Sequence, residues 1–277
     1  MTTVTAPAPA LARTLAYDAQ DPHPLVARVA RELGYADRVG TVVGLSSARE
    51  VLLTAGTAHD VDGLVRVGDV HQPRRRLLRA LMDAPSALSV VAAVTVPWPW
   101  VWCTPEGFDA GPVRVRKTAY GDLAGYFTAE GIDCELVSDY LTATEMLAGL
   151  GERSVVLDAD EVPAGLTRTR GVGDQAHPLS YGLISRLPAA EPDYCWLGLQ
   201  PDADRPGSLN ASLARLAARE VDLDFLFSDS VADRAHRFFL GFRADADTAA
   251  AVVADLRAEG SEVRVLGSFT LPDDEPV

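Results

Sequence analysis

The feature that most constrains the fold is a repeated order of strands and helices near the end of the chain, from Tyr194 to Phe269. Short apolar runs typical of strands alternate with stretches in which apolar residues recur at helical spacing. The predicted strands cover residues 194–200, 221–227, 236–242 and 263–269, and the predicted helices cover 209–220 and 248–259. This order, βαββαβ, is that of a split βαβ unit.

Two motifs within this unit carry a resemblance. The sequence Arg205-Pro206-Gly207-Ser208-Leu209 forms the first turn, and Val265-Leu266-Gly267-Ser268-Phe269 closes the unit. Together they resemble the regulatory ACT domain of prephenate dehydratases, which has a Pro-Gly-Ala-Leu turn and a final Val-Leu-Gly-Ser-Tyr strand. The resemblance implies an amino-acid effector, and pairing of chains into a homodimer or tetramer. The effector residues that it implies are Gly207, Ser208, Leu209 and Asp222, although the turn itself also requires the glycine.

Composition narrows the function classes. A formal charge of -14 over 277 residues argues against a general nucleic-acid or anionic-membrane binder, but leaves a local basic site open. The cysteines Cys103, Cys134 and Cys195 fit neither a disulfide framework nor a metal-ligand spacing, which is typical of a reducing cytosol. No apolar run has the length of a membrane span. We therefore expect a cytoplasmic protein with a flexible arm over residues 1–13.

The chain from residue 14 to 190 alternates strands with amphipathic helices, which predicts an α/β domain with a largely parallel sheet. The run 88–96 is continuous and rich in β-forming residues, and it is predicted to be buried on both faces. A return of the chain after Gly111 predicts two lobes with a ligand cleft between them. The first lobe covers about 14–110 plus 179–190, the second covers 111–178, and the ACT-like unit covers 191–277.

Several strings in this region resemble the catalytic domain of prephenate dehydratases, which implies a two-lobed fold like that of periplasmic binding proteins. Gly68-Asp-Val-His-Gln72 resembles that family's Gly-Ser-Val helix start, and Leu141-Thr-Ala143 resembles its Ser-Thr-Ala helix start. The segment 174–182 resembles the segment that carries the Thr-Arg-Phe signature. The order and spacing of these strings before an ACT-like unit carry the resemblance.

The chain departs from the family where the chemistry should lie. Thr-Arg-Phe becomes Ser180-Tyr181-Gly182, and the Glu-Asn-Ser expected before Gly68 is missing. Gly-Pro-Glu-Gly-Thr is replaced by residues 19–23, and Ser-His-Pro-Gln-Ala by residues 117–121. In the ACT-like unit, Glu-Ser-Arg-Pro becomes Phe227-Ser-Asp-Ser230, which argues against feedback by phenylalanine.

The resemblance implies a lyase acting on prephenate, a dicarboxylate. Dehydration needs a donor to the leaving hydroxyl, and Ser180 can replace the family's threonine in that role. Related prephenate decarboxylases keep the hydroxyl and have Ser followed by an aromatic residue, as in Ser180-Tyr181. We therefore predict a decarboxylase; the alternatives are a true dehydratase, or a relative that has lost catalysis and binds a ligand or partner. The predicted catalytic residues are Ser180, Tyr181, Thr142 and His177, and the predicted substrate-binding residues are Lys117, Arg116, Thr118 and His23.

Structural roles compete with each of these assignments. Ser180 can be a hydroxyl at a strand edge, Thr142 is first of all a helix N-cap, and Arg116 and Lys117 can be solvated surface residues. His177 lies between Ala and Pro in a predicted loop. Trp98, Trp100 and Trp102 alternate and by default pack in the core or between the lobes. The sequence shows no metal site, nucleotide loop or acyl-transfer triad, so we expect no cofactor.

Overall fold

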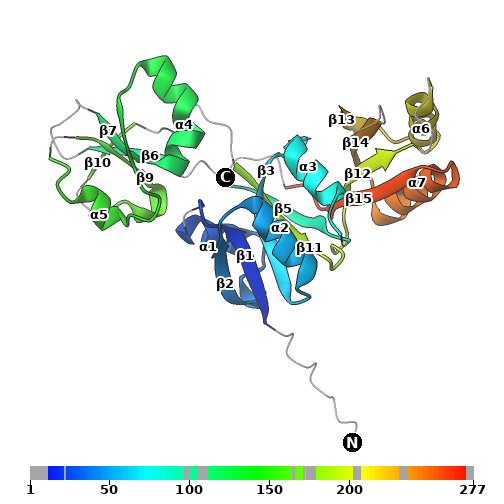
Figure 1. The fold of residues 1–277 in the computed structure, drawn as a ribbon, viewed down its shortest axis with the longest axis horizontal. Coiled ribbons are helices and arrows are strands. Elements are labelled where there is room, and N and C mark those ends of the chain that lie inside the picture. Colours follow the sequence, from blue (N-terminus) through cyan, green and yellow to red (C-terminus); the bar gives the residue numbers. More distant parts are fainter. Residues whose placement is uncertain are drawn as a thin grey trace, which may run out of the picture.

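The computed structural model describes residues 12–21, 23–85, 87–96, 100–104, 112–151, 153–163, 166–170, 172, 179–201, 207–230 and 236–272. The described elements form three bodies in a row (Figure 1). We call them the central lobe (β1–β3, β5, β11 and α1–α3), the outer lobe (β6–β10, α4 and α5) and the C-terminal unit (β12–β15, α6 and α7). One sheet of ten strands runs through the central lobe and the C-terminal unit, and a second sheet of five strands belongs to the outer lobe.

The central lobe is a sheet with helices on both faces. Its strands are β1 (Arg13–Asp18), β2 (Val39–Leu45), β3 (Val61–Asp69), β5 (Ser89–Val96) and β11 (Leu179–Ser185), with the short β4 (Gln72–Pro73) beside β3. Helix α1 (His23–Glu32) buries one apolar face against the sheet, and α2 (Ala48–Thr57) and α3 (Arg75–Met82) cover the opposite face. The Ser47 side chain accepts a hydrogen bond from the Glu50 N–H and caps α2, as Ser does at an N-terminus.

The outer lobe is built around the strand order β10-β6-β9-β7-β8. Its strands are β6 (Trp100–Thr104), β7 (Val113–Arg116), β8 (Cys134–Val137), β9 (Val155–Asp158) and β10 (Thr167–Arg170). Helix α4 (Lys117–Glu130) buries Ala119, Leu123 and Phe127 and ends at Gly131, whose φ of 65° favours glycine. The short α5 (Ala143–Leu147) lies on the other side of the lobe (Figure 1).

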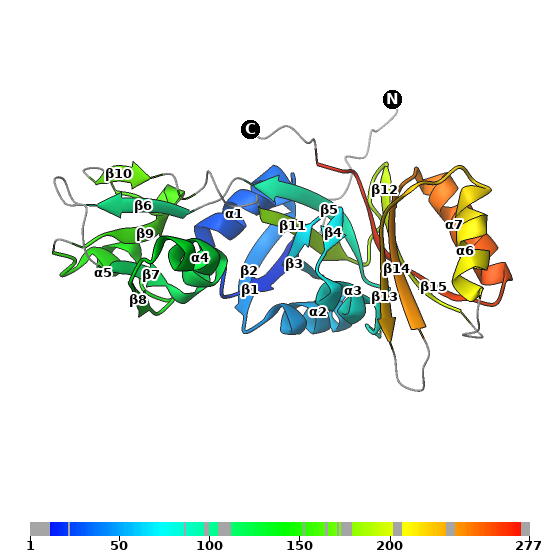
Figure 2. The ribbon, with the colours of Figure 1, turned by 90° about the horizontal axis from the view of Figure 1, so that it is seen from above.

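The C-terminal unit has the βαββαβ order that the sequence predicts. It consists of β12 (Tyr194–Gln200), α6 (Ser208–Ala217), β13 (Leu223–Ser230), β14 (His236–Arg243), α7 (Ala246–Ala258) and β15 (Glu262–Phe269). Both helices pack on one face of the antiparallel sheet β13-β14-β12-β15 (Figure 2). Successive side chains of a strand point to opposite faces, and in β12 both sets are apolar: Cys195, Leu197 and Leu199 face the helices, whereas Tyr194 and Trp196 belong to the core on the opposite face.

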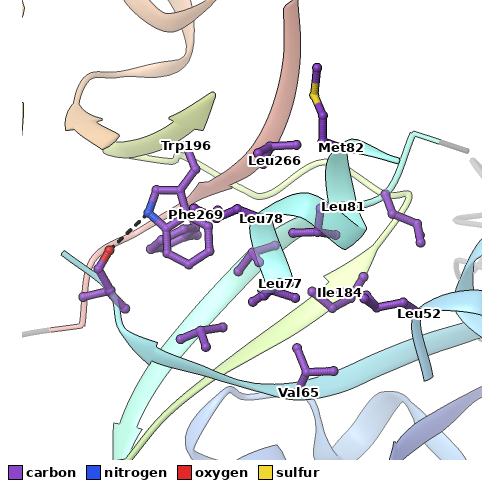
Figure 3. Close-up of a cluster of buried hydrophobic side chains, with 14 of the residues drawn as sticks. Leu52, Val65, Leu77, Leu78, Leu81, Met82, Ile184, Trp196, Leu266 and Phe269 are labelled. Carbon is purple, nitrogen blue, oxygen red and sulfur yellow. Dashed lines mark hydrogen bonds between the residues drawn. The ribbon is translucent and has the colours of Figure 1, made fainter. Parts of the chain in front are cut away.

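That opposite face packs on helix α3 of the central lobe. Trp196 and Phe269 contact each other edge to face, and both are fully buried with Leu78 and Leu81 of α3 (Figure 3). The Trp196 indole N–H donates to the carbonyl of Val70 over 3.1 Å, so the polar edge of the ring is satisfied within the core. The central lobe and the C-terminal unit therefore share one hydrophobic core.

Three fold predictions need correction. Strand β6 belongs to the outer sheet, so the first lobe ends before Trp100 and not at about residue 110. The central sheet is mixed, because β11 returns from the outer lobe and pairs antiparallel with both β3 and β5. Strand β5 is only half-buried at most positions. In the first two cases the cause is long-range pairing, which a local apolar pattern does not determine.

Cys103, Cys134 and Cys195 are free thiols, and Trp100 and Trp102 lie in the core of the outer lobe. No helix in the described ranges is long and apolar enough to cross a bilayer.

Candidate functional site

The candidate site lies where the central lobe meets the outer lobe. Asp21, Arg66 and Tyr181 belong to the central lobe, and Trp100 and Asp122 belong to the outer lobe. We call these five residues the inter-lobe cluster. They come from five separate segments of the chain, and a chain of hydrogen bonds joins all of them.

Sheet geometry brings Arg66 and Tyr181 together. Strands β3 and β11 are antiparallel neighbours, and Tyr181 is the register partner of Arg66. Directly opposed residues lie on the same face of a sheet, within reach of each other. Asp21 follows the end of β1 in a turn that is closed by a hydrogen bond from its own N–H to the Asp18 carbonyl over 2.8 Å. The turn therefore holds the Asp21 carboxylate over the carboxyl end of β1.

The Arg66 guanidinium is the centre of the cluster. Its Nε donates to Asp21 Oδ1 over 2.7 Å and to the Tyr181 hydroxyl over 3.1 Å. Its Nη1 donates across the lobe boundary to Asp122 Oδ1 over 2.6 Å, and the other oxygen of Asp122 accepts from the Trp100 indole over 3.0 Å. The remaining nitrogen, Nη2, is buried and has no hydrogen-bond partner among the described residues. One donor of a buried arginine is thus left for a further acceptor.

Burial and charge shift the ionisation of this cluster. Burial raises the pKa of Asp21 above its usual value, and this effect outweighs the opposite effect of Arg66. Burial likewise raises the pKa of Tyr181, so its phenol stays protonated across the physiological range. Burial lowers the pKa of Arg66, but Asp21, Tyr181 and Asp122 together raise it by more. The net pKa is above its usual value, so the guanidinium keeps its charge. The cluster therefore contains a cation and a buried carboxyl whose pKa lies above its usual value.

Ser180 lies apart from the cluster, although it is adjacent to Tyr181 in sequence. Leu179, Tyr181 and Leu183 share the core on the α1 face, whereas Ile184 belongs to the core on the opposite face. Strand alternation places Ser180 on that opposite face. Ser180 is buried, and its Oγ lies 3.0 Å from the Thr95 hydroxyl of β5. The two predicted catalytic neighbours therefore face different sides of the sheet.

Three of the predicted substrate-binding residues lie at the first turns of α1 and α4. The Thr118 hydroxyl donates to the Gln20 carbonyl over 2.8 Å, which makes a second bond between the lobes. Lys117 is exposed at the start of α4, and His23 is exposed at the start of α1 with its ring edge to face with Tyr17. The structure thus brings Thr118 to the lobe boundary, where Arg66 is a further cation, and the substrate-binding roles of Lys117, Thr118 and His23 stay predictions.

Arg116 and Thr142 have structural contacts in the outer lobe. Arg116 is buried, pairs with Glu161 over 2.6 Å and donates to the Leu141 carbonyl over 2.7 Å, so it is not the solvated residue that the alternative interpretation expected. Thr142 caps α5 in a capping box with Glu145, which confirms its predicted N-cap role. Among the described residues, no hydrogen bond joins Arg116 or Thr142 to the inter-lobe cluster.

The other predicted residues lie elsewhere. His177 and Trp98 are outside the described residues. Gly207 precedes α6 with a φ of 95°, a conformation that favours glycine, and Leu209 packs partly against the core under α6 and α7. Asp222 is exposed before β13. Residues 205 and 206 of the predicted turn lie outside the described residues, and the effector role of Gly207, Ser208, Leu209 and Asp222 stays a prediction.

Sequence reasoning missed four of the five cluster residues in this role. Arg66 is a charged residue within an apolar strand, and Asp21 lies in the string that replaces the family's glycine-rich turn. Each was a usable signal. From the sequence alone, Asp122 is expected on a solvated helix face. Its contact with Trp100 depends on how α4 packs. Within the described residues, no group of three or more His, Cys, Asp or Glu can hold a metal ion.

Comparison with solved structures shows which known proteins share this fold. No protein-family model matches the sequence, and a search of curated proteins finds no significant match. Solved structures do match. A prephenate dehydratase from Arthrobacter aurescens, in complex with L-Phe, superposes with a TM-score of 0.70 and 19% identity over 95% of this chain and 92% of that one.

Two further structures show the same arrangement. The prephenate dehydratase from Staphylococcus aureus has a TM-score of 0.67 and 16% identity, and the match covers 93% of this chain and all 100% of that one. GqqA, described as a novel type of quorum quenching acylase, has a TM-score of 0.62 and 20% identity over 93% of this chain and 98% of that one. The chain therefore has the fold of the prephenate dehydratases, with a strongly divergent sequence.

Proposed function

We propose that the protein is a lyase that acts on prephenate or a close dicarboxylate analogue at the inter-lobe cluster. The observation that carries the proposal is Arg66, a largely buried cation at the lobe boundary whose Nη2 has no hydrogen-bond partner among the described residues. A guanidinium binds a carboxylate through two parallel hydrogen bonds, and it is suited to a buried site because it keeps its charge there. The shared fold supports prephenate as the substrate. It does not fix the reaction, since GqqA carries a different named activity on the same fold.

Substrate binding in this proposal is an exchange of carboxylates. Asp122 accepts from Arg66 Nη1, and Nη2 of the same guanidinium has no partner. A substrate carboxylate that accepts from Nη1 and Nη2 together replaces Asp122 in a bidentate pair. Asp122 then keeps its hydrogen bond from Trp100, while Lys117 at the start of α4 is available for the second carboxylate.

The contact of Ser180 with Thr95 supports decarboxylation rather than dehydration as the proposed reaction. In dehydration the ring loses CO₂ and hydroxide, and the hydroxide needs a proton to leave as water. Ser180, the predicted donor, is paired with Thr95 on the face of the sheet away from Arg66. In decarboxylation the C–C bond to the carboxylate breaks, its electron pair shifts through the diene, and a ring carbon takes a proton while the hydroxyl stays. Asp21 is the proton donor in this proposal, because its carboxyl contacts the guanidinium that binds the substrate, and burial raises its pKa above the usual value.

We also propose the domain organisation that the family resemblance implies. Residues 14–190 form the prephenate dehydratase-like part, and residues 191–277 form an ACT domain. The βαββαβ order of the C-terminal unit and the Gly207 turn support this assignment. Binding of an amino-acid effector at Gly207, Ser208, Leu209 and Asp222, assembly into a homodimer or tetramer and a cytoplasmic location belong to the same proposal.

A ligand-binding protein without turnover is the second candidate. The observation in its favour is that Asp21 and Asp122 already neutralise Arg66 and hold the two lobes together. Because the cation is already paired with carboxylates of the protein, a dianion can bind it only if one of these ion pairs breaks. This candidate predicts binding of the same dicarboxylate at the same guanidinium, without chemistry.

Incubation of the purified protein with prephenate separates these functions. The proposal predicts a product that has lost CO₂ alone, identified by mass spectrometry and by the absence of the strong ultraviolet absorbance of phenylpyruvate enolate in alkali. The Asp21→Asn variant keeps the hydrogen-bond acceptor for Arg66 but has no proton to donate, so we expect its turnover to fall by about 10²-fold or more. Formation of phenylpyruvate would instead establish dehydration. Unchanged prephenate beside an active control enzyme would exclude both lyase reactions on this substrate.

A further inference from the structure

Strand β2 ends the ten-stranded sheet on the side away from the C-terminal unit, next to β1 (Figure 1). Among the described residues it pairs only with β1, in a parallel register that is regular from Thr41 to Leu45. One edge of β2 therefore carries backbone N–H and C=O groups that have no strand partner in this part of the chain. An edge of this kind is a template for pairing with another strand.

Alternation along the strand identifies the backbone groups at this edge. The N–H of Ala19, which follows β1, donates to the Leu45 carbonyl over 2.7 Å, so the backbone groups of Leu45 point toward β1. Backbone groups of successive strand residues point to opposite edges. Those of Val42 and Gly44 therefore point away from β1, where an antiparallel strand can exchange hydrogen bonds with them.

The side chains of β2 lack the features that usually protect an edge. Residues 39–45 contain no charge and no proline, and residues 40–44 are exposed. Val42 and Val43 are 39% and 38% exposed, and strand alternation puts them on opposite faces of the sheet. At the other end of the sheet, β13 carries Asp224 and Asp229, charges of the kind that discourage strand pairing. The composition of β2 therefore favours a partner strand on its free edge.

Charges flank β2 in a pattern that complements itself. Arg38 lies just before the strand and is exposed, and its side chain has no hydrogen bond or ion pair within the described residues. Just after the strand, the N–H and the hydroxyl of Ser46 donate to Glu50 Oε2 over 2.9 and 2.6 Å, which holds this exposed carboxylate at the end of β2. A second β2 that runs antiparallel brings the cationic end of each strand beside the anionic end of the other. This complementarity identifies a second copy of the chain as the partner.

We propose that β2 pairs antiparallel with β2 of a second copy, across a twofold axis close to Val42. A twofold axis requires a surface that complements itself, and an antiparallel pair of identical strands meets this requirement. Val42 then lies opposite Val42 of the other copy, and Arg38 of each copy pairs with Glu50 of the other. The two ten-stranded sheets become one continuous sheet. This interface requires neither the lyase activity nor pairing of the C-terminal units.

Charge reversal tests the interface in the full chain. Arg38→Glu and Glu50→Arg each place like charges at both ends of the paired strands, so we expect the dissociation constant for self-association of each variant to rise about tenfold. A mixture of the two variants restores opposite charges at both ends, and we expect it to form one-to-one mixed dimers with nearly wild-type affinity. Sedimentation velocity measures the association, and native mass spectrometry with one variant isotope-labelled identifies the mixed dimers.

Val42→Lys is a second test, because it places a charge from each copy near the axis. We expect this variant to halve the mass of the wild-type assembly, whether or not the C-terminal units also pair. Leu136→Lys, at a residue of β8 in the outer lobe that is 50% exposed, is the control and should leave the mass unchanged. Circular dichroism spectra that match the wild type show that each variant is folded.

Three results would overturn the proposal. The first is a wild-type protein that stays monomeric up to its limit of solubility. The second is an assembly whose mass is changed neither by Val42→Lys nor by the charge reversals, because it would then form through another surface. The third is a mixture of the charge-reversal variants that associates no more tightly than either variant alone, since the two ends of β2 would then not meet.

Discussion

The central lobe meets its two neighbours through contacts of different kinds. Toward the outer lobe, the described contacts include an ion pair from Arg66 to Asp122 and a hydrogen bond from Thr118 to Gln20. Toward the C-terminal unit, Trp196 and the rest of a continuous hydrophobic core are buried (Figure 3). One junction depends on a few directed polar contacts, and the other depends on apolar area.

This difference indicates which junction can respond to a ligand. Apolar burial is non-directional, and no single small molecule replaces it. An ion pair across a boundary can be exchanged for a ligand carboxylate at the same guanidinium, because the two acceptors are chemically alike. The inter-lobe cluster is therefore the place for ligand exchange, and the core under the C-terminal sheet holds the frame in which it occurs.

The largest effect is expected at the apolar junction. Trp196→Ala removes a fully buried indole that contacts Phe269 and bonds the Val70 carbonyl, and it should lower the free energy of unfolding by about 3–5 kcal/mol. Urea denaturation measures this change. Leu226→Ala on β13, at a side chain that is 40% exposed, is the control and should cost about 0.5 kcal/mol or less. A loss below about 1 kcal/mol for Trp196→Ala would mean that the two bodies do not share a core.

Arg66→Met should have the next largest effect, and on the other junction. It leaves Asp21 and Asp122 unpaired, which should lower stability by about 2–4 kcal/mol. Hydrogen exchange should become faster in α4, while α3 stays protected. Arg114→Met is a matched control, because both arginine side chains are 12% exposed and Arg114 pairs with Glu135 within the outer lobe. Equal acceleration in α4 for both variants would contradict a specific bridge by Arg66.

A smaller effect is expected at the rim of the apolar junction. Arg79 of α3 pairs with Asp229 of β13, with Nε 2.6 Å from a carboxylate oxygen, but its side chain is 49% exposed. Solvent screens such a pair, so Arg79→Met should change the free energy of unfolding by only about 0.2–1 kcal/mol. If the loss in urea denaturation approached that of Trp196→Ala, electrostatics and not apolar burial would hold this junction.

The smallest effect concerns pH and lies outside both junctions. The N–H of Thr248 donates to the Asp245 side chain that caps α7, and this bond lowers the pKa of Asp245. A carboxyl with a lowered folded-state pKa stabilises the fold above its unfolded pKa, and this contribution is lost as the pH falls through the folded value. Asp245→Asn keeps a capping oxygen that does not titrate, so its acid unfolding should depend less on pH. Superimposable acid-unfolding curves for the two proteins would contradict this assignment.

The sequence predicts local structure here better than it predicts the site. Apolar periodicity indicates α3, and strand alternation indicates β12, because each pattern is read within one element. Strand β6 was placed in the wrong lobe since its residues, Trp100 among them, show alternation but not which sheet they join. The return of β11 between β3 and β5 is likewise a long-range pairing.

The candidate site could not be predicted from the sequence for the same reason, because it also depends on long-range pairing. Arg66 and Tyr181 become neighbours only through the register of β3 and β11, and Asp122 reaches Arg66 only because α4 faces the central lobe. The family resemblance predicts a ligand site between two lobes, and it assigns the chemistry to motif positions such as Ser180, which contacts Thr95 away from Arg66. A charged residue inside an apolar strand was the available signal for Arg66, since burying such a charge requires partners.

The most direct test of the exchange at Arg66 is the affinity for prephenate, measured by stopped-flow tryptophan fluorescence before turnover. Trp100 donates to Asp122 and should report the exchange, and a Trp100→Phe variant should lose that signal. We predict that Arg66→Met binds at least about tenfold more weakly, and that Asp122→Asn binds several-fold more tightly because the competing carboxylate is gone. Unchanged affinity in both variants would contradict the account, because prephenate would then bind without this guanidinium.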